Sequence, residues 1–136
     1  MIAFQIGGDE SDFVRVSITR DNEDGWLSAD VDIEAGQFRA SYPADFDTFA
    51  FSEFSKQLAV LNKTLAGSAE FTSLEGQLEL TLTCDSLGHV SVKGKAMDVA
   101  GTGHQLLFDL EIDQTHIPEI LDSLKATLKK HPVRSF

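Results

Sequence analysis

Apolar and polar residues alternate along much of this chain, and a period of two is typical of β-strands that bury only one face. Gly36 interrupts one alternating stretch, and Pro43 is expected to end the stretch that follows it, since proline donates no backbone hydrogen bond. A turn rich in Asp and Asn lies between two stretches, at residues 21–25. The first part of the chain therefore predicts an antiparallel meander, with strands at residues 4–6, 14–19, 27–34 and 37–42.

The spacing of apolar residues then changes to three and four, which predicts an amphipathic helix near residues 51–66. Ser52 is a candidate N-cap of this helix, and Gly67 is a candidate C′ residue. Helical spacing by itself explains the phenylalanines of this segment, so core packing is favoured over contact with a ligand. The expected apolar face consists of Phe51, Phe54, Leu58, Leu61 and Leu65.

The second half of the chain repeats this order of elements. Gln77 and Glu79 are assigned to the outward face of a strand, and Glu79 is expected to lie near Lys93 across a hairpin. Thr115 suits the N-cap of a final helix near residues 116–130, which ends in lysines that complement its dipole. The strands are predicted at residues 69–71, 78–84, 90–95 and 106–112.

These elements predict an α+β fold, in which antiparallel β-meanders carry two amphipathic helices packed on their apolar faces. The length of 136 residues fits a single domain covering residues 1–136, and an apolar share of 42% is typical of a globular protein. No apolar run approaches the roughly 18 residues that span a bilayer, and the first residues do not form a secretory signal. We therefore expect a cytoplasmic protein.

The two halves can be aligned with each other at a shift of 63 residues. The shift places the segment that begins at Gly25 on the segment that begins at Gly88. One interpretation is a pseudo-repeat of residues 1–66 and 67–136, that is, two units of a strand meander plus a helix. The other is similar patterning without duplication, because the same shift loses the strand phase elsewhere.

Net charge narrows the range of partners. The chain has 22 acidic against 11 basic residues, which gives a net charge of −11 and a pI near 4.6. Such a field repels phosphate groups, so direct binding of nucleic acid or of an anionic membrane is not expected. A basic protein would be attracted, although an acidic surface also serves solubility alone.

The sequence contains none of the common catalytic motifs. It has neither a phosphate-binding glycine loop nor a Gly-x-Ser-x-Gly motif. Cys84, the only cysteine, is in phase with the inward residues of its strand, which predicts a buried, unreactive thiol and excludes an internal disulfide. We therefore expect no enzymatic activity, no cofactor and no metal. The histidines also lack partners at helical spacing: His89, His104, His116 and His131.

Two rows of carboxylates form the most distinctive polar pattern. Acidic residues at i, i+2 and i+4 share one face of a strand and repel one another, so they must be solvated, paired or matched by cations. We name them the first ridge, Asp30, Asp32 and Glu34, and the second ridge, Asp109, Glu111 and Asp113. A solvated face is the simpler interpretation, and docking of a basic protein is the alternative.

Two residues beside these ridges have more than one interpretation. Trp26 is a candidate anchor for a partner, although its place at the start of a buried strand favours core packing. Asp113 is also placed to hydrogen-bond the start of the final helix. Both are therefore candidate partner-binding residues with a structural alternative.

The order of several motifs extends over nearly the whole chain from residue 13. They are Gly25-Trp26-Leu27, Phe54-x-x-x-Leu58-x-x-Leu61-x-x-x-Leu65-x-Gly67, Ala69-x-Phe71, Gly76-x-Leu78-x-Leu80-x-Leu82, Gly88-x-Val90-x-Val92 and Phe108-x-Leu110-x-Ile112-Asp113-Gln114-Thr115. In this order they resemble the WapI-like immunity proteins of bacterial toxin systems. Most of the positions are core and turn residues, so the resemblance supports the fold more than an activity.

The resemblance implies a non-enzymatic binding protein, because the family's namesake blocks a tRNA-cleaving toxin domain delivered by contact. The expected partner is a cognate protein toxin, a basic nuclease that an acidic inhibitor would attract. Two other functions stay open. One is a metal- or small-ligand-binding protein that uses the acidic strand faces, and the other is a structural module that associates with itself, for instance as a homodimer.

Overall fold

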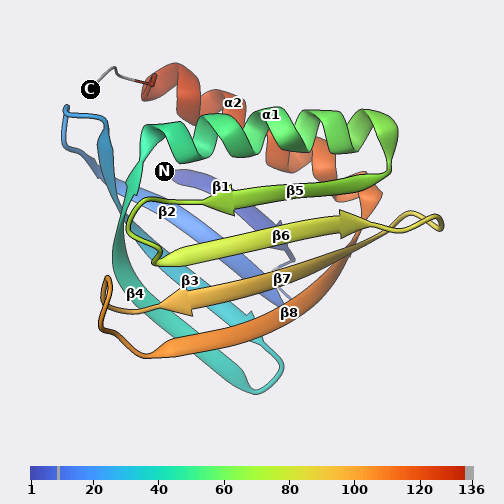
Figure 1. The fold of residues 1–136 in the computed structure, drawn as a ribbon, viewed down its shortest axis with the longest axis horizontal. Helices are drawn as coiled ribbons and strands as arrows, with labels where there is room; N and C mark the ends of the chain where they lie inside the picture. Colours follow the sequence, from blue (N-terminus) through green and yellow to red (C-terminus); the bar gives the residue numbers. More distant parts are fainter. Residues whose placement is uncertain (9, 134–136) are drawn as a thin grey trace.

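The computed structural model describes residues 1–8 and 10–133, and it shows four strands and a helix twice over (Figure 1). The first series is β1 (Ile2–Gly7), β2 (Phe13–Asp21), β3 (Trp26–Ala35), β4 (Phe38–Asp47) and α1 (Thr48–Thr64). The second is β5 (Gly67–Thr72), β6 (Leu78–Cys84), β7 (His89–Met97), β8 (Gln105–Asp113), the 3-10 turn η1 (Gln114–His116) and α2 (Ile117–Lys130). The predicted α+β fold is confirmed.

Each series of strands forms a sheet of its own. The spatial orders β1-β2-β3-β4 and β5-β6-β7-β8 follow the chain, and every neighbouring pair is antiparallel. The predicted meanders are therefore confirmed, including the edge strand at the start of the chain. In Figure 1 one sheet lies behind the other, and their strands cross at an angle. The pseudo-repeat stays a prediction, since this order of elements fits either of its two interpretations.

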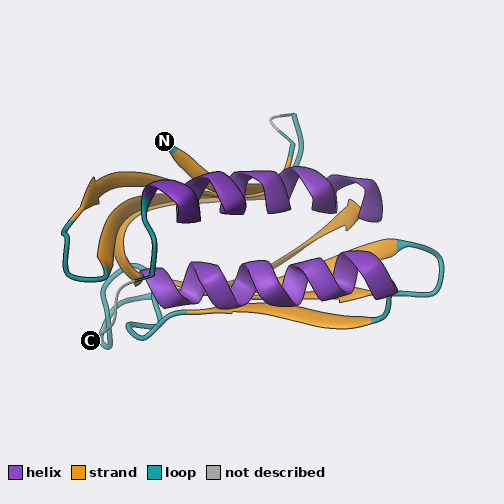
Figure 2. Ribbon diagram, turned by 90° about the horizontal axis from the view of Figure 1, so that it is seen from above, coloured by secondary structure: helices purple, strands orange, loops and turns teal. Residues whose placement is uncertain are grey.

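Each helix packs against the sheet of the other series. α1 follows β4 but lies along β5, whereas α2 follows β8 and lies along β1. The two helices also contact each other and run side by side (Figure 2). Because each helix packs on the sheet of the other series, both series share one contiguous apolar core. Within the described residues, neither helix is long and apolar enough to cross a membrane.

Five phenylalanine side chains form the centre of this core, and all five are fully buried. The ring of Phe71 on β5 lies among the other four, with centroid distances of 5.4 to 5.7 Å. The ring pairs are tilted or edge-to-face, the arrangement that the aromatic quadrupole favours. The four surrounding rings come from β1, β4 and α1: Phe4, Phe46, Phe51 and Phe54. Core packing of the helical phenylalanines is thus confirmed.

The N-cap of α1 is Asp47, and the prediction of Ser52 was wrong. The carboxylate of Asp47 accepts a hydrogen bond from the N–H of Ala50 at 3.0 Å. Its second oxygen accepts one from the N–H of Leu74 at 3.1 Å, so the same side chain holds the segment after β5. A carboxylate at a helix N-terminus also complements the helix dipole. Ser52 lies inside the helix, which begins at Thr48, so it cannot be the N-cap.

The C-terminal end of α1 also differs from the prediction. Leu65 is the C-cap, with a φ of 53°, and its N–H donates to the carbonyl of Leu61 at 2.8 Å. Gly67 also has a positive φ, of 90°, but it lies beyond the C′ position. The turn leaves the Leu65 side chain exposed, although the helical spacing assigned it to the core. Gly67 is instead the first residue of β5.

Pro43 does not end its strand, contrary to prediction. β4 continues through Pro43, which lies opposite Asp30 on β3. β4 is the last strand of its sheet, and every second residue of such a strand points its backbone N away from the neighbouring strand. Proline is compatible with those positions, because no hydrogen bond of the ladder is lost there.

Gln77 is buried, although the strand pattern assigned it to the outward face. Its Oε1 accepts from the N–H of Asp45 at 3.1 Å, and its Nε2 donates to the carbonyls of Pro43 and Asp98 at 3.4 Å each. The hydroxyl of Tyr42 donates to the Gln77 carbonyl at 2.6 Å, and burial raises the pKa of Tyr42. Gln77 therefore joins β4 to the second sheet through hydrogen bonds that sequence periodicity does not reveal.

The inward row of β6 was predicted correctly, but one pairing was not. Cys84 is 8% exposed, in phase with the buried leucines of its strand, as expected. Glu79 lies opposite Lys95, and Lys93 lies opposite Thr81. The short turn between β6 and β7 pairs Cys84 with Val90, and this register determines the pairs further along the hairpin.

Phe71→Ala is expected to lower the free energy of unfolding by about 3–5 kcal/mol, because it leaves a cavity among four buried rings. Phe49→Ala is a matched control on α1, where the ring is 51% exposed, and should cost less than about 1 kcal/mol. Urea unfolding monitored by tryptophan fluorescence measures both values. Equal costs for the two variants would contradict the central position of Phe71.

Gly94→Ala is expected to destabilise the second sheet by about 1–3 kcal/mol, since overpacking forces neighbouring groups to move. Gly94 on β7 lies directly under the ring of Phe108 on β8, and an added Cβ would overlap that ring. Adding Phe108→Leu to the same chain should recover part of the loss. Thermal unfolding of the single and double variants provides the measurement, and a double variant less stable than Gly94→Ala would argue against this contact as the cause.

Candidate interaction surface

The first ridge lies on the outward face of β3, where its side chains have partners of their own. Oε1 of Glu34 lies 3.4 Å from Nη2 of Arg39 on β4. Asp32 accepts a hydrogen bond from the hydroxyl of Ser41 at 2.8 Å. Both carboxylate residues are half-buried, and only Asp30 of this ridge is exposed. The first ridge therefore resembles an ordinary strand face with local charge pairing.

The second ridge lies on β8, the last strand of its sheet. Asp109 and Glu111 are exposed, and the Glu111 side chain keeps 67% of its accessible surface. Asp109 lies opposite Lys93 on β7, but among the described residues it makes neither a hydrogen bond nor an ion pair. Oε1 of Glu111 approaches Nδ1 of His89 to only 4.0 Å. These two carboxylates are thus available to a partner.

Asp113, at the end of the same ridge, has a structural role. Its Oδ1 accepts from the N–H of Thr115 at 3.0 Å and caps η1. This backbone hydrogen bond lowers the pKa of Asp113 from its ordinary value, because it stabilises the charged form. The hydrogen bond predicted for Asp113 at the entry to the last helix is present, although it caps η1 and not α2 itself. The prediction of Thr115 as the N-cap of that helix was wrong. The 3-10 turn precedes α2, which begins without a side-chain cap.

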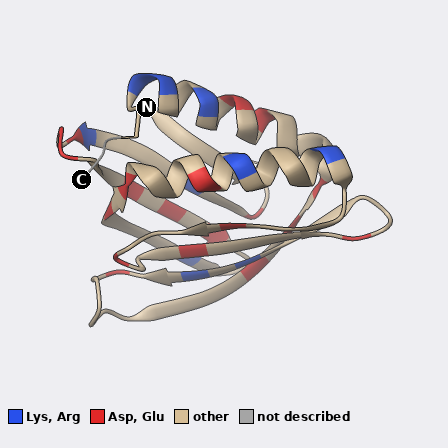
Figure 3. Ribbon diagram, turned by 45° about the horizontal axis from the view of Figure 1, so that its top comes forward, with Lys and Arg blue, Asp and Glu red and all other residues tan. Residues whose placement is uncertain are grey.

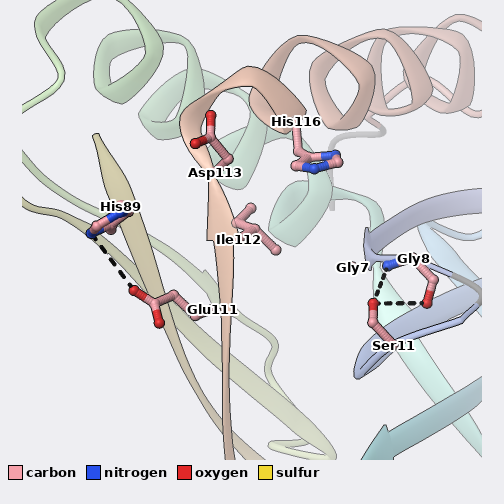
Figure 4. Close-up of a pocket in the computed structure, with 8 residues that line it drawn as sticks. All are labelled: Gly7, Gly8, Ser11, His89, Glu111, Ile112, Asp113 and His116. Atoms are coloured by element: carbon pink, nitrogen blue, oxygen red, sulfur yellow. Dashed lines mark hydrogen bonds and ion pairs between the residues drawn. The ribbon is translucent and has the colours of Figure 1, made fainter. Parts of the chain in front are cut away.

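A surface hollow of about 450 Å³ lies between the end of β8 and the β1–β2 turn (Figure 4). In Figure 4, Ser11 and Gly8 form one side, and His89 and Glu111 form the other. Within the described part of the chain, no group of three or more His, Cys, Asp and Glu residues is placed to hold a metal ion. The lining consists of Gly7, Gly8, Ser11, His89, Glu111, Ile112, Asp113 and His116.

Three further hollows continue along β8 toward its first residue, with volumes of about 380, 440 and 200 Å³. Neighbouring hollows share lining residues, so together they follow β8 over its whole length. Along the middle of β8 the opposite wall consists of Asp12, the turn at residues 35–37 and Phe38. We name the three hollows, from Gln105 to Glu111, the β8 groove.

Two large apolar side chains line this groove and are mostly exposed. Phe38 is 68% exposed and Leu107 is 73% exposed, and both border the hollow of about 440 Å³. Leu107 lies in the strand predicted at residues 106–112, but it was not among the residues predicted to bind a partner. The usable signal was a leucine at the outward position two residues before Asp109. Phe38 gave no comparable signal, because it is in phase with the inward residues of its strand, and it is exposed at the first position of β4.

Trp26 is placed apart from the second ridge. It is the first residue of β3, lies opposite Asp47 and is half-buried. Its backbone N–H donates to Oδ1 of Asp24 at 3.1 Å, within the turn that precedes the strand. Trp26 borders none of the hollows along β8. The structure therefore brings Asp109 and Glu111 together with the groove, but not Trp26.

Basic residues lie on the two helices and also on β7, where Lys93 and Lys95 are opposite Asp109 and Leu107 of β8. In Figure 3 the longest blue segments lie on the two helices, whereas red segments are spread over the strands and turns. The last turn of α2 carries Lys129 and Lys130, where cations complement the helix dipole. The excess of negative charge therefore lies on the sheets and their turns.

Comparison with solved structures bears on the fold alone. The chain is similar to MRP1/MRP2 of Trypanosoma bruciei, with a TM-score of 0.53 and 15% identity over 94% of this chain and 84% of that one. It is also similar to a chain of the CdiA-CT/CdiI toxin and immunity complex from Enterobacter cloacae, with a TM-score of 0.47 and 10% identity over 82% of this chain and 97% of that one. No curated protein matches the sequence.

A sequence-family model matches almost the full length. It describes the immunity protein WapI-like family and matches residues 5–132, which include every strand from β2 onward and both helices. The match agrees with the motifs quoted from the sequence, whose order runs from Gly25 to Thr115. The chain belongs to the immunity protein WapI-like family.

Proposed function

We propose that this protein neutralises a cognate protein toxin by binding it directly and covering the part of the toxin that acts. Membership of an immunity protein family supports this role. The toxin is a basic nuclease, and the immunity protein contributes no catalytic step of its own. Specific binding, and not turnover, is then the property on which protection depends.

The second ridge is the observation that carries this proposal. Asp109 and Glu111 are exposed, lie on an edge strand and stand beside two exposed apolar side chains. An apolar centre with charged residues around it is the usual composition of a protein-binding surface. A small ligand is less well matched, because it needs a concave site that encloses most of its surface.

Charge supports the choice of a basic partner. With a net charge of −11, the protein creates a field that accelerates the approach of a cation-rich protein. Nucleases carry basic residues to hold the phosphate backbone, so an acidic surface that covers those residues also blocks the substrate site. Steering and occlusion then come from the same group of carboxylates.

Neutralising the second ridge by Asp109→Asn and Glu111→Gln is expected to lower the association rate with the toxin about tenfold at low salt. The matched variant Asp30→Asn with Asp32→Asn removes the same charge from the first ridge. We expect a smaller loss there, since only long-range steering is weakened. Surface plasmon resonance with a catalytically inactive form of a candidate toxin domain from the same genome, at several salt concentrations, measures both rates.

Co-expression in bacteria tests protection itself. Cells that produce the active toxin domain should survive with the wild-type protein and lose protection when binding is lost. Binding that is equally strong and equally salt-dependent in wild type and in both ridge variants would overturn the electrostatic part of the proposal. A wild-type protein that neither binds nor protects would overturn the immunity role against that toxin.

A further inference from the structure

Two of the four sheet edges are covered by helices. The outer strands of a sheet expose unpaired backbone groups, which proteins normally pair, cover or interrupt. On β1, the carbonyl of Ala3 accepts from the hydroxyl of Thr127 on α2 at 3.2 Å. On β5, the N–H of Glu70 donates to Oε1 of Gln57 on α1 at 2.9 Å. Each helix therefore both packs on an edge strand and binds its backbone.

The two remaining edges differ from each other. On β4, Pro43 offers no N–H, and the N–H of Asp45 is bound by Oε1 of Gln77. β8 forms the lower border of the front sheet in Figure 1 and has only β7 as a neighbour in its sheet. It is nine residues long and contains no proline or glycine. Apart from its outward carboxylates, β8 is thus the edge without a device that blocks pairing among the described residues.

The backbone groups on the free side of β8 can be identified from its register. The N–H of Gln114 donates to the carbonyl of Gly88, the N–H of Asp98 donates to the carbonyl of His104, and the β7–β8 register between them is unbroken. Antiparallel strands exchange bonds at every second residue, so the even-numbered residues of β8 face β7. Among the described residues, no hydrogen bond reaches the groups on the other side. Those groups belong to Gln105, Leu107, Asp109 and Glu111.

The residues with free backbone groups also carry the exposed side chains of the β8 groove. Asp109 and Glu111 provide negative charge, and Leu107 provides apolar surface. Phe38 stands across the groove and leaves space of about 440 Å³ between the two sheets. Backbone donors, backbone acceptors and side chains for recognition therefore lie along one open edge.

We propose that β8 accepts an extended basic segment of a protein partner as an additional strand of the second sheet. The inference takes the identity of the partner from the proposed function and takes the geometry of binding from the edge itself. Antiparallel addition continues the pattern of the sheet and is slightly more stable than parallel addition.

The side chains of β8 define the sequence that such a segment needs. In antiparallel register, side chains opposite Glu111 and Asp109 should be Lys or Arg, because charges directly across a ladder lie close together. The side chain opposite Leu107 should be apolar, since it contacts Leu107 and Phe38. Read from its N-terminus, the segment follows the pattern basic-x-basic-x-apolar.

A second copy of this chain fits the edge poorly. Pairing of β8 with another β8 around Asp109 would set the two Asp109 side chains against each other and Leu107 against Glu111. Like charges directly opposite destabilise a ladder, and two chains of net charge −11 also repel at a distance. The acidic side chains therefore select against self-association and in favour of a basic strand.

A peptide provides a direct test on the wild-type protein. The probe is the capped peptide Thr-Arg-Thr-Arg-Thr-Val-Thr, and the control carries Glu in place of both Arg residues. We expect amide NMR signals of Leu107, Asp109 and Glu111 to shift with the basic peptide and to exchange more slowly with water. No shift along β8 at millimolar peptide, or equal shifts with the acidic peptide, would overturn the inference.

Asp109→Pro removes one free N–H and should weaken the basic peptide about tenfold. Asp109→Asn keeps that N–H and should lose less, so the pair separates the backbone contribution from the charge. Thr72→Pro is the matched control, because it removes the same kind of outward N–H from β5, whose edge faces α1. Equal losses in Asp109→Pro and Thr72→Pro would contradict a specific role of β8. If Asp109→Pro does not fold, the NMR shifts of the wild type decide.

The toxin separates this inference from the proposed function. Wild-type binding of the toxin domain together with unchanged affinity of Asp109→Pro would overturn the added strand and leave the immunity role intact. Peptide shifts along β8 without toxin binding would overturn that role and retain the strand site. Sedimentation of the wild type should show a monomer, and a dimer lost in Asp109→Pro would assign the edge to a second copy instead.

Discussion

The packing of Phe71 among four other phenylalanine rings is the contact on which the rest of the fold depends. Phe71 belongs to the second series, whereas its four neighbours belong to the strands and the helix α1 of the first series. Two four-stranded sheets with one apolar face each cannot be stable alone in water, so each must cover the other. The aromatic cluster fills the space where both sheets and α1 meet. Its burial thereby fixes how the two sheets cross.

This packing determines which sheet edges are open. α1 contributes two of the five rings, and α2 runs beside α1 (Figure 2). α1 consequently reaches β5, and α2 reaches β1, where side chains of each helix bind the edge backbone. No helix is left for β4 or β8. Pro43 and Gln77 block strand pairing at the edge of β4. The edge of β8 therefore stays open because of the way the core is packed.

The fold could be predicted from periodicity because most inward residues alternate or recur at helical spacing. Two of the failures, at Asp47 and Gln77, share a physical cause, which is a polar side chain that bonds to backbone distant in sequence. Asp47 caps α1 and also holds Leu74, and Gln77 holds Asp45 across the two sheets. Burial of Gln77 satisfies groups that no local pattern indicates. The prediction that Pro43 ends its strand was wrong because proline is tolerated in an edge strand. The sequence did not reveal that β4 is an edge strand.

The candidate surface was only partly recognisable from sequence, since two equivalent rows of carboxylates were present. Their difference arises from position in a sheet. β3 is an inner strand, so Asp32 and Glu34 have neighbours on both sides, among them Ser41 and Arg39. β8 has one neighbour, and Asp109 and Glu111 stay exposed.

An exposed edge is a risk for aggregation, and carboxylates on its outward positions reduce that risk without closing the edge. Proline or a bulge would close it to every partner, whereas negative charge repels acidic chains and attracts basic ones. The arrangement on β8 therefore has the form expected of an edge that must stay open for one class of strand. A surface selected for solubility alone would not need Leu107 and Phe38 exposed beside those charges. The apolar pair thus supports the proposal that β8 is a binding edge and not merely a protected one.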